Sequence, residues 1–128
     1  MPIDMQKQIA YWRDGAVKDM QVGGRLIERD KEILHGLFFA QLALEKALKA
    51  HVCKHTSQIP PRTHKLAAHA QLGNVRLSQG DSDFLAAMET YQLEGRYPEI
   101  DFSGPSLETA MEYLRRAQEM VKWLTKQL

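Results

Sequence analysis

Apolar residues recur at helical spacing along most of this chain, and the pattern predicts a series of helices. The first runs from about residue 4 to residue 29, with a stripe formed by Met5, Ile9, Trp12, Ala16, Met20, Gly23 and Ile27. Asp4 suits the N-cap, because a short carboxylate accepts hydrogen bonds from free backbone N–H groups. Within this helix, Gly23-Gly24 indicates either a kink or a close approach by another helix.

A second helix is predicted from about residue 31 to residue 55, and its middle is apolar almost all round. A helix of that kind is usually buried on several sides. From Glu45 onward, polar residues indicate that one side of this helix is exposed to water. Glu45 and Lys49 have the favourable i, i+4 spacing, which predicts an ion pair on the surface.

Proline and glycine divide the rest of the chain into shorter helices. After Pro60-Pro61, a short helix is expected over residues 63–72, ended by Gly73-Asn74. Another is expected from about residue 81 to residue 95, with Phe84, Leu85, Met88 and Tyr91 facing inward. The last helix would begin at residues 103–105, with Pro105 in its first turn. No segment alternates like a strand, so the sequence predicts an all-α, up-and-down bundle of four to five helices in one domain, residues 1–128.

Composition places few further limits on the chain. Its 128 residues, 44% hydrophobic and 26% charged, are typical of an ordinary globular domain. No apolar run is long enough to span a membrane, and the N-terminus lacks the apolar block of a secretion signal. Cys53 is the single cysteine, so an intrachain disulfide is impossible. These features favour a cytoplasmic protein without a membrane partner.

Charge is sorted unevenly along the chain. Residues 46–80 contain no Asp or Glu, but they hold six of the 17 Lys and Arg residues and four of the five His residues. The rest of the chain contains the remaining 11 Lys and Arg residues and all 16 acids. Such sorting indicates a positive region for a nucleotide, RNA or an acidic partner. The alternative is that these cations are scattered over several faces and simply solvated.

Three motifs in order give the chain a family resemblance. They are Phe39-Ala40-Gln41 followed by Glu45-Lys46-Ala47-Leu48-Lys49-Ala50, Thr63-His64-Lys65-Leu66 after the proline break, and Arg96-Tyr97-Pro98. Together with Trp12, Ala16 and Asp19 in the first helix, they resemble the HEPN domain family. The resemblance implies a small helical bundle, usually a homodimer, associated with nucleotides and RNA. Small members are often encoded beside a nucleotidyltransferase, and some such pairs act as toxin and antitoxin.

Ribonucleases of that family resemble one another in an arginine followed, after four to six residues, by a histidine. If Arg96 were that arginine, the histidine would lie at position 101, 102 or 103, where this chain has Asp101, Phe102 and Ser103. Cleavage of RNA without a metal needs a group that moves a proton near neutral pH, and histidine is the natural choice. The sequence therefore indicates that the familiar ribonuclease site is missing.

The best candidates for anion binding are Lys46, Lys49, His64, Lys65, Arg96 and Tyr97. Arginine can take two phosphate oxygens, lysine supplies a point charge, and Tyr97 can stack on a base. The competing interpretation is that Arg96 caps a helix or pairs with Glu94 or Glu99. We expect no catalytic residues, no cofactor and no metal site, because Gly23-Gly24 is not a phosphate loop and His51 and His55 would hold a metal only if His64 or His69 supplied a third ligand. His51 and His55 are expected to be solvated.

The sequence thus favours a non-catalytic module that binds a nucleotide or RNA, or that serves as the partner of a nucleotidyltransferase in a toxin–antitoxin-like pair. A homodimer is expected from the resemblance. The alternative is a metal-independent ribonuclease toxin that uses Arg96 with a nonstandard proton carrier, such as His64 or Asp101.

Overall fold

A computed structural model describes residues 3–93 and 104–128 of the chain. These residues form five helices: α1 (Met5–Glu28), α2 (Ile33–Thr56), α3 (Leu66–Leu72), α4 (Gln79–Glu89) and α5 (Leu107–Lys126). Over the described ranges there is no strand. The prediction of an all-α helical bundle is therefore confirmed.

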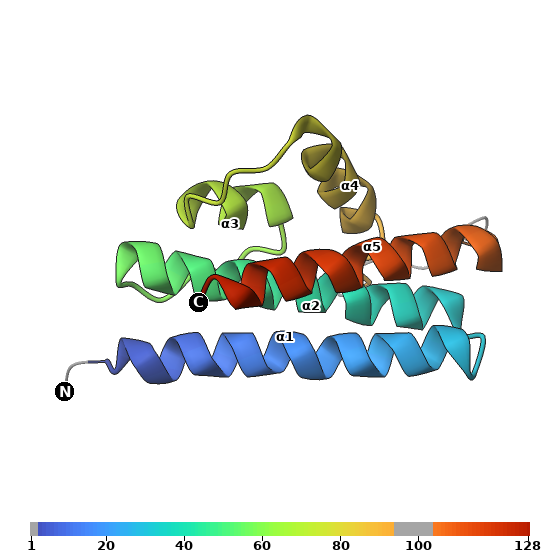
Figure 1. Cartoon of the computed structure of the whole chain (residues 1–128), viewed down its shortest axis with the longest axis horizontal. Helices are drawn as coiled ribbons and strands as arrows, with labels where there is room; N and C mark the ends of the chain where they lie inside the picture. The colour runs from blue at the N-terminus through green and yellow to red at the C-terminus, as the bar shows by residue number, and fades with distance from the viewer. Residues whose placement is uncertain (1–2, 94–103) are drawn as a thin grey trace.

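The central element of the bundle is α2, which packs against all four other helices. α1 lies along one side of α2 and runs in the opposite direction, as Figure 1 shows. α5 runs parallel to α2, because α3 and α4 carry the chain back along the other side of the bundle (Figure 1). This central position explains why α2 is apolar almost all round.

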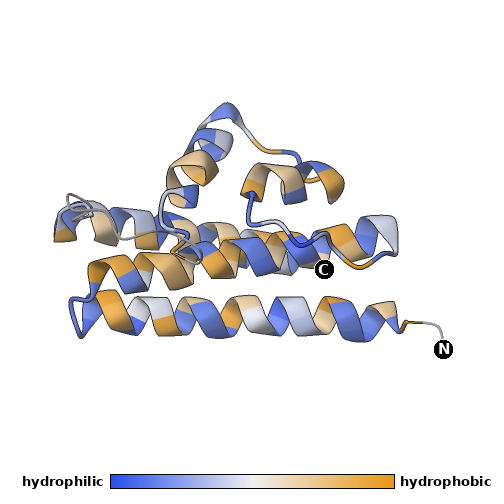
Figure 2. Ribbon diagram, turned by 180° about the vertical axis from the view of Figure 1, so that it is seen from behind, coloured by the Kyte–Doolittle hydropathy of each residue, from blue (hydrophilic) through white to orange (hydrophobic). Residues whose placement is uncertain are grey.

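α1 begins as its sequence predicts. The carboxylate of Asp4 accepts a hydrogen bond of 3.2 Å from the backbone N–H of Lys7. In Figure 2, hydrophilic and hydrophobic patches alternate along α1, as expected for a helix with one face on the bundle and one in water. Lys31 adopts a left-handed conformation, with φ of 57°, in the turn that leads into α2.

The glycines of α1 mark a close approach by α2. A Cβ atom at Gly23 would lie 2.9 Å from the backbone oxygen of Gly36, and one at Gly36 would lie 2.3 Å from Ile27 Cγ1. Neither contact leaves room for a side chain. Of the two alternatives that the sequence left open, the structure therefore has close helix packing at Gly23.

Three helix boundaries differ from the sequence-based prediction. α3 begins at Leu66 rather than residue 63, and α4 ends at Glu89 rather than residue 95. α5 begins later than expected, because the hydroxyl of Ser106 caps it by accepting from the backbone N–H of Thr109 at 3.2 Å. Pro105 therefore lies before the cap and not in the first turn.

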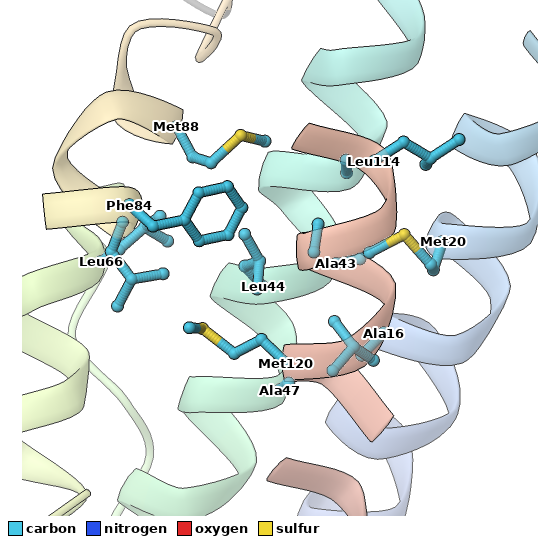
Figure 3. Packing of buried hydrophobic residues seen from close by; sticks show 14 of the residues in the cluster. Ala16, Met20, Ala43, Leu44, Ala47, Leu66, Phe84, Met88, Leu114 and Met120 are labelled. Carbon is cyan, nitrogen blue, oxygen red and sulfur yellow. The ribbon is translucent and has the colours of Figure 1, made fainter. Parts of the chain in front are cut away.

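The core is built where α2 faces α1, α4 and α5. Phe84 and Met88 point from α4 toward α2, and Phe84 lies beside Leu44 (Figure 3). Phe84 and Met88 are each 2% exposed or less, which confirms the inward face predicted for α4. Among the described helices, none combines the length and apolar character needed to cross a bilayer.

Candidate functional site

The most elaborate polar arrangement of the described residues is centred on Glu45, in the middle of α2. Glu45 is 3% exposed. Its Oε2 lies 2.9 Å from Lys49 Nζ, and its Oε1 accepts from His64 Nδ1 at 3.0 Å. We call this group the Glu45 cluster and define it as Trp12, Gln41, Glu45, Lys49, His64 and His69. A buried carboxylate thus holds together two of the candidate residues that the sequence analysis selected.

Lys49 is fixed on two sides. Its side chain is only 12% exposed, with Glu45 on one side and the ring of Trp12 on the other, the ammonium nitrogen 4.8 Å from the ring centroid. A desolvated ammonium is strongly attracted to both a carboxylate and an aromatic face. The Glu45–Lys49 pair is confirmed, but its expected surface location was wrong, because α1 covers this face of α2.

His64 lies at the edge of the cluster, in the segment between α2 and α3. Its side chain is 48% exposed. Its backbone oxygen accepts from the amide of Gln41 at 3.4 Å, so the loop is tied to α2. Since a carboxylate oxygen only accepts, His64 Nδ1 is the donor in the contact with Glu45.

His69 supports this loop from α3. It is fully buried, and its Nε2–H donates to the backbone oxygen of Thr63 at 2.7 Å. Burial is the main reason that the pKa of His69 is lowered, with Lys49 and His64 lowering it further and Glu45 opposing them. The ring is therefore neutral near pH 7, and its Nδ1 has no hydrogen-bond partner in the described part of the protein.

Lys46 is held outside the Glu45 cluster. Its Nζ lies 2.7 Å from Asp19 Oδ2, across the interface between α2 and α1. The aliphatic stem of Lys46 passes over Gly15, where a Cβ atom would lie 3.1 Å from Lys46 Cδ. An acid from α1 thus neutralises a cation of the acid-free stretch.

Lys65 remains on the surface. It precedes the first residue of α3 and is exposed. The N–H at the start of this helix is satisfied by Glu89 from α4, whose Oε1 accepts from Leu66 N at 2.7 Å. Over residues 3–93 and 104–128, the Lys65 side chain has no ion pair.

Arg96 and Tyr97 lie outside the described residues. The chain leads toward them from the Glu45 cluster, because the amide of Gln92 donates to Gln41 Oε1 at 3.1 Å. Of the six sequence-based site residues, the structure thus brings Lys49 and His64 together, separates Lys46, and leaves Lys65 exposed beside His64.

Sequence reasoning missed the buried half of the cluster. Gln41, Glu45 and Lys49 repeat every four residues, which places all three on one face of α2. That spacing was a usable signal. The roles of Trp12 and His69 had no comparable signal, because they depend on how α1 and α3 pack against α2.

The two histidines near the end of α2 were both expected to be solvated, but only one of them is exposed. His55 is exposed, but His51 is 7% exposed and its Nε2–H donates to the backbone oxygen of Leu124 at 2.8 Å. Burial lowers the pKa of His51 despite that hydrogen bond. The described residues contain no group of three potential metal ligands from His, Cys, Asp and Glu. Cys53 is buried, and burial raises the pKa of its thiol, which disfavours the nucleophilic thiolate.

Comparison with known proteins gives one match. The model of the HEPN domain family matches residues 9–128, nearly the whole chain. No curated protein and no solved structure matches.

Proposed function

The chain belongs to the HEPN domain family, and on this premise we propose that it binds the phosphate groups of a nucleotide or of RNA at the exposed edge of the Glu45 cluster. His64 and Lys65 would contact the ligand directly. Arg96 would bind a second phosphate oxygen and Tyr97 would stack on a base.

The observation that carries this proposal is the position of His64. Glu45, Gln41 and His69 fix the loop and the ring from the buried side, while about half of the His64 side chain faces solvent. Exposed Lys65 follows it in the chain. A loop held in place from the buried side, next to an exposed ammonium, suits a phosphate, because little order must be lost on binding.

Chain geometry supports a contribution from Arg96. Gln92 contacts Gln41 within the Glu45 network and precedes Arg96 by four residues. Four residues extend at most about 14 Å. A contribution from Arg96 is therefore part of the proposal.

The paired cations play a smaller part in the proposal. Lys49 and Lys46 are each paired with a carboxylate, at 2.9 and 2.7 Å. A paired ammonium contributes little net attraction to an approaching polyanion. Lys49 therefore acts mainly by holding Glu45 in place, and Lys46 by joining α2 to α1.

Titration with ATP, GTP and a short single-stranded RNA tests the proposal. The chain has two tryptophans, so a Trp123→Phe background leaves Trp12, which contacts Lys49, as the fluorescent reporter. Lys65→Ala and Arg96→Ala should each weaken RNA binding severalfold and lower the salt dependence by about one counterion. Arg76→Ala, at another exposed cation of the acid-free stretch, is the control. Absence of binding by all three ligands would reject the proposal.

A second candidate function is docking of a partner protein such as a nucleotidyltransferase. The neutralised pairs at Lys46 and Lys49 favour it, because they reduce the attraction for a polyanion. A hollow of about 300 Å³ between α1 and α5 supports it further, since Val17, Met20 and Val121 line it and Val17 is 43% exposed. An apolar side chain of a partner would fit there.

Capture of a nucleotidyltransferase by the tagged protein, with and without ATP, tests this second candidate. Val17→Asp should abolish capture, and Lys65→Ala should leave it intact. Capture that is lost in Lys65→Ala and kept in Val17→Asp would favour the phosphate site. Sedimentation of the protein alone at micromolar concentration tests the proposed homodimer, and a monomer would contradict it.

A further inference from the structure

We propose that a hollow between α4 and α5 binds a guanine base. The hollow measures about 250 Å³, and its walls are formed by Asp81, Arg116, Glu119, Met120 and Trp123. None of these residues belongs to the Glu45 cluster, so the hollow is a different site from the phosphate site at Lys65. The inference goes beyond the proposed function and does not depend on it. Guanine is the chemistry shared by two sources, a free nucleotide and a base in RNA.

α5 presents an aromatic ring to the hollow. Arg116, Met120 and Trp123 are spaced by four and three residues, which places them on one face of the helix. Met120 is nearly buried, whereas Trp123 is 43% exposed. An exposed indole at the wall of a hollow offers a flat surface on which a base can stack.

Arg116 is held in place on the α4 side. Its guanidinium carbon lies 4.5 Å from the centroid of the Phe84 ring, and its Nη2 donates to the backbone oxygen of Gly80 at 3.4 Å. The same nitrogen lies 3.9 Å from Asp81 Oδ1. Arginine has five N–H donors, and the side chain remains 42% exposed. A fixed, partly exposed guanidinium binds a planar ligand with little loss of side-chain order.

The charges around the hollow compensate one another. Asp81 faces Arg116, and Glu119 Oε1 lies 3.2 Å from Arg115 Nη1. Two carboxylates are thus set against two guanidinium groups, which leaves no strong attraction for a phosphate or for a cation. A neutral ligand with donors and acceptors along its edge suits these surroundings better.

The polar groups of the hollow match the edges of guanine. An arginine binds the O6 and N7 acceptors of this base with two hydrogen bonds. A carboxylate accepts from N1–H and from the exocyclic N2 amino group. Glu119 is available for this role, because its side chain is 67% exposed and its surface pair with Arg115 contributes little energy. Arg116 would thus bind the O6 and N7 side, Glu119 the N1 and N2 side, and Trp123 the face of the ring.

Adenine and larger ligands fit less well. Adenine carries an amino group where guanine has O6, so only N7 remains as an acceptor for Arg116. Its N1 is an acceptor that would face the carboxylate of Glu119. Sites for drug-sized molecules typically hold roughly 300–1,000 Å³, so about 250 Å³ suits one base and not a whole nucleotide.

Fluorescence titration of the full chain with guanosine tests the site. The chain has two tryptophans, so a Trp12→Phe background leaves Trp123 as the reporter and keeps an aromatic ring beside Lys49. Guanosine should quench Trp123 by stacking on it, and adenosine, the matched ligand, should bind about 5- to 150-fold more weakly. Neither nucleoside carries a phosphate, so binding at Lys65 does not contribute.

RNA distinguishes the two sources of guanine. A short RNA of adenosines with a single guanosine is compared with the same RNA made only of adenosines. Quenching of Trp123 by guanosine but not by the guanosine-containing RNA assigns a free nucleotide as the ligand. Quenching by both, with none from the adenosine RNA, assigns a base in RNA as well.

Two conservative variants test the polar contacts. Arg116→Lys keeps the charge but loses the second hydrogen bond, and it should reduce the affinity for guanosine about 5- to 150-fold. Glu119→Gln keeps the size but has one acceptor oxygen in place of two, so it should narrow the preference for guanosine over adenosine. Glu112→Gln, at an exposed acid of α5 outside the hollow, is the control. A thermal melt establishes that each variant is folded.

The outcomes are distinct from those of the phosphate site. Equal quenching by guanosine and adenosine, or no quenching by guanosine, would overturn the guanine site. Parental affinity in folded Arg116→Lys, or a parental preference in folded Glu119→Gln, would also overturn it. Binding at Lys65 is followed separately through Trp12 in the Trp123→Phe background. Lys65→Ala should leave the guanosine signal of Trp123 unchanged, so failure of either site leaves the other standing.

Discussion

Lys46 and Asp19 form an ion pair across the interface of α1 and α2, with Nζ and Oδ2 2.7 Å apart. Their side chains are 27% and 12% exposed. Lys46 belongs to a stretch with no acid of its own, so its partner comes from a helix about 27 residues earlier in the chain. The absence of acids from residues 46–80 therefore does not leave an unpaired positive charge at Lys46.

Removing Lys46 should destabilise the fold. Lys46→Ala leaves the Asp19 carboxylate partly buried without its partner, at an expected cost of about 1–3 kcal/mol in the free energy of unfolding. The double variant with Asp19→Ala should cost less than the sum of the two single variants, with a coupling energy of about 1 kcal/mol. Denaturant unfolding measures each value. Lys18→Ala, at an exposed neighbouring position, is the control, and additive losses would contradict the pairing.

Two adjacent glycines of α1 should respond oppositely to alanine. Gly23→Ala places a Cβ atom 2.9 Å from a backbone oxygen of α2, and this overpacking should cost about 1–3 kcal/mol. At Gly24 the nearest atom is the Gln118 amide nitrogen at 3.5 Å, so alanine fits there. Its higher helix propensity should stabilise the protein by up to about 1 kcal/mol.

Melting temperatures of the two alanine variants measure this difference directly. Each variant gains the same helix propensity, so Gly24→Ala is the matched control for Gly23→Ala. Equal melting temperatures would show that α1 and α2 are not in close contact at Gly23.

Stability should fall as the solution is acidified, because burial lowers the pKa of both His51 and His69. Below the ordinary histidine pKa of about 6.5, the unfolded chain takes up protons that the folded protein does not. This contribution to stability is present above pH 6.5 and is lost as pH falls toward the lowered folded-state pKa values. Each histidine contributes a slope of at most about 1.4 kcal/mol per pH unit.

Urea unfolding of the His51→Gln variant between pH 7.5 and 5.5 checks the assignment. Loss of the hydrogen bond to Leu124 should lower stability at pH 7.5 by about 1 kcal/mol, and the pH slope should become smaller than in the parent protein. The exposed residue His55, changed to Gln, serves as the control. A parental slope in His51→Gln would contradict the role of burial.

Glu89, a residue of α4, should stabilise the N-terminus of α3. It accepts from the N–H of Leu66 at 2.7 Å, and α3 has no side-chain cap from its own N-cap residue, Lys65. Glu89→Ala should therefore cost about 1–2 kcal/mol, as loss of an N-cap does. Hydrogen exchange should show faster exchange of the Leu66 amide. Glu112→Ala, at an exposed acid of α5, should leave that amide protected.

The helix content of the fold was accessible from the sequence. The apolar stripe of α1 and the apolar middle of α2 follow from local periodicity, because every turn of a helix must present the same face to the core. The boundaries were less accessible. α4 ends at Glu89 rather than residue 95, and Ser106 caps α5. The sequence did not predict these boundaries, because a helix terminus depends on single hydrogen bonds that several nearby residues are able to make.

The sequence by itself determined the helical class, the family resemblance and the i, i+4 spacing that aligns Gln41, Glu45 and Lys49. Tertiary structure alone decided the state of those charges. α1 brings Asp19 to Lys46 and Trp12 to Lys49, and the loop before α3 brings His64 to Glu45. Electrostatic energy depends on separation in space and on exposure to water, and neither quantity is encoded in the distance between residues along the chain.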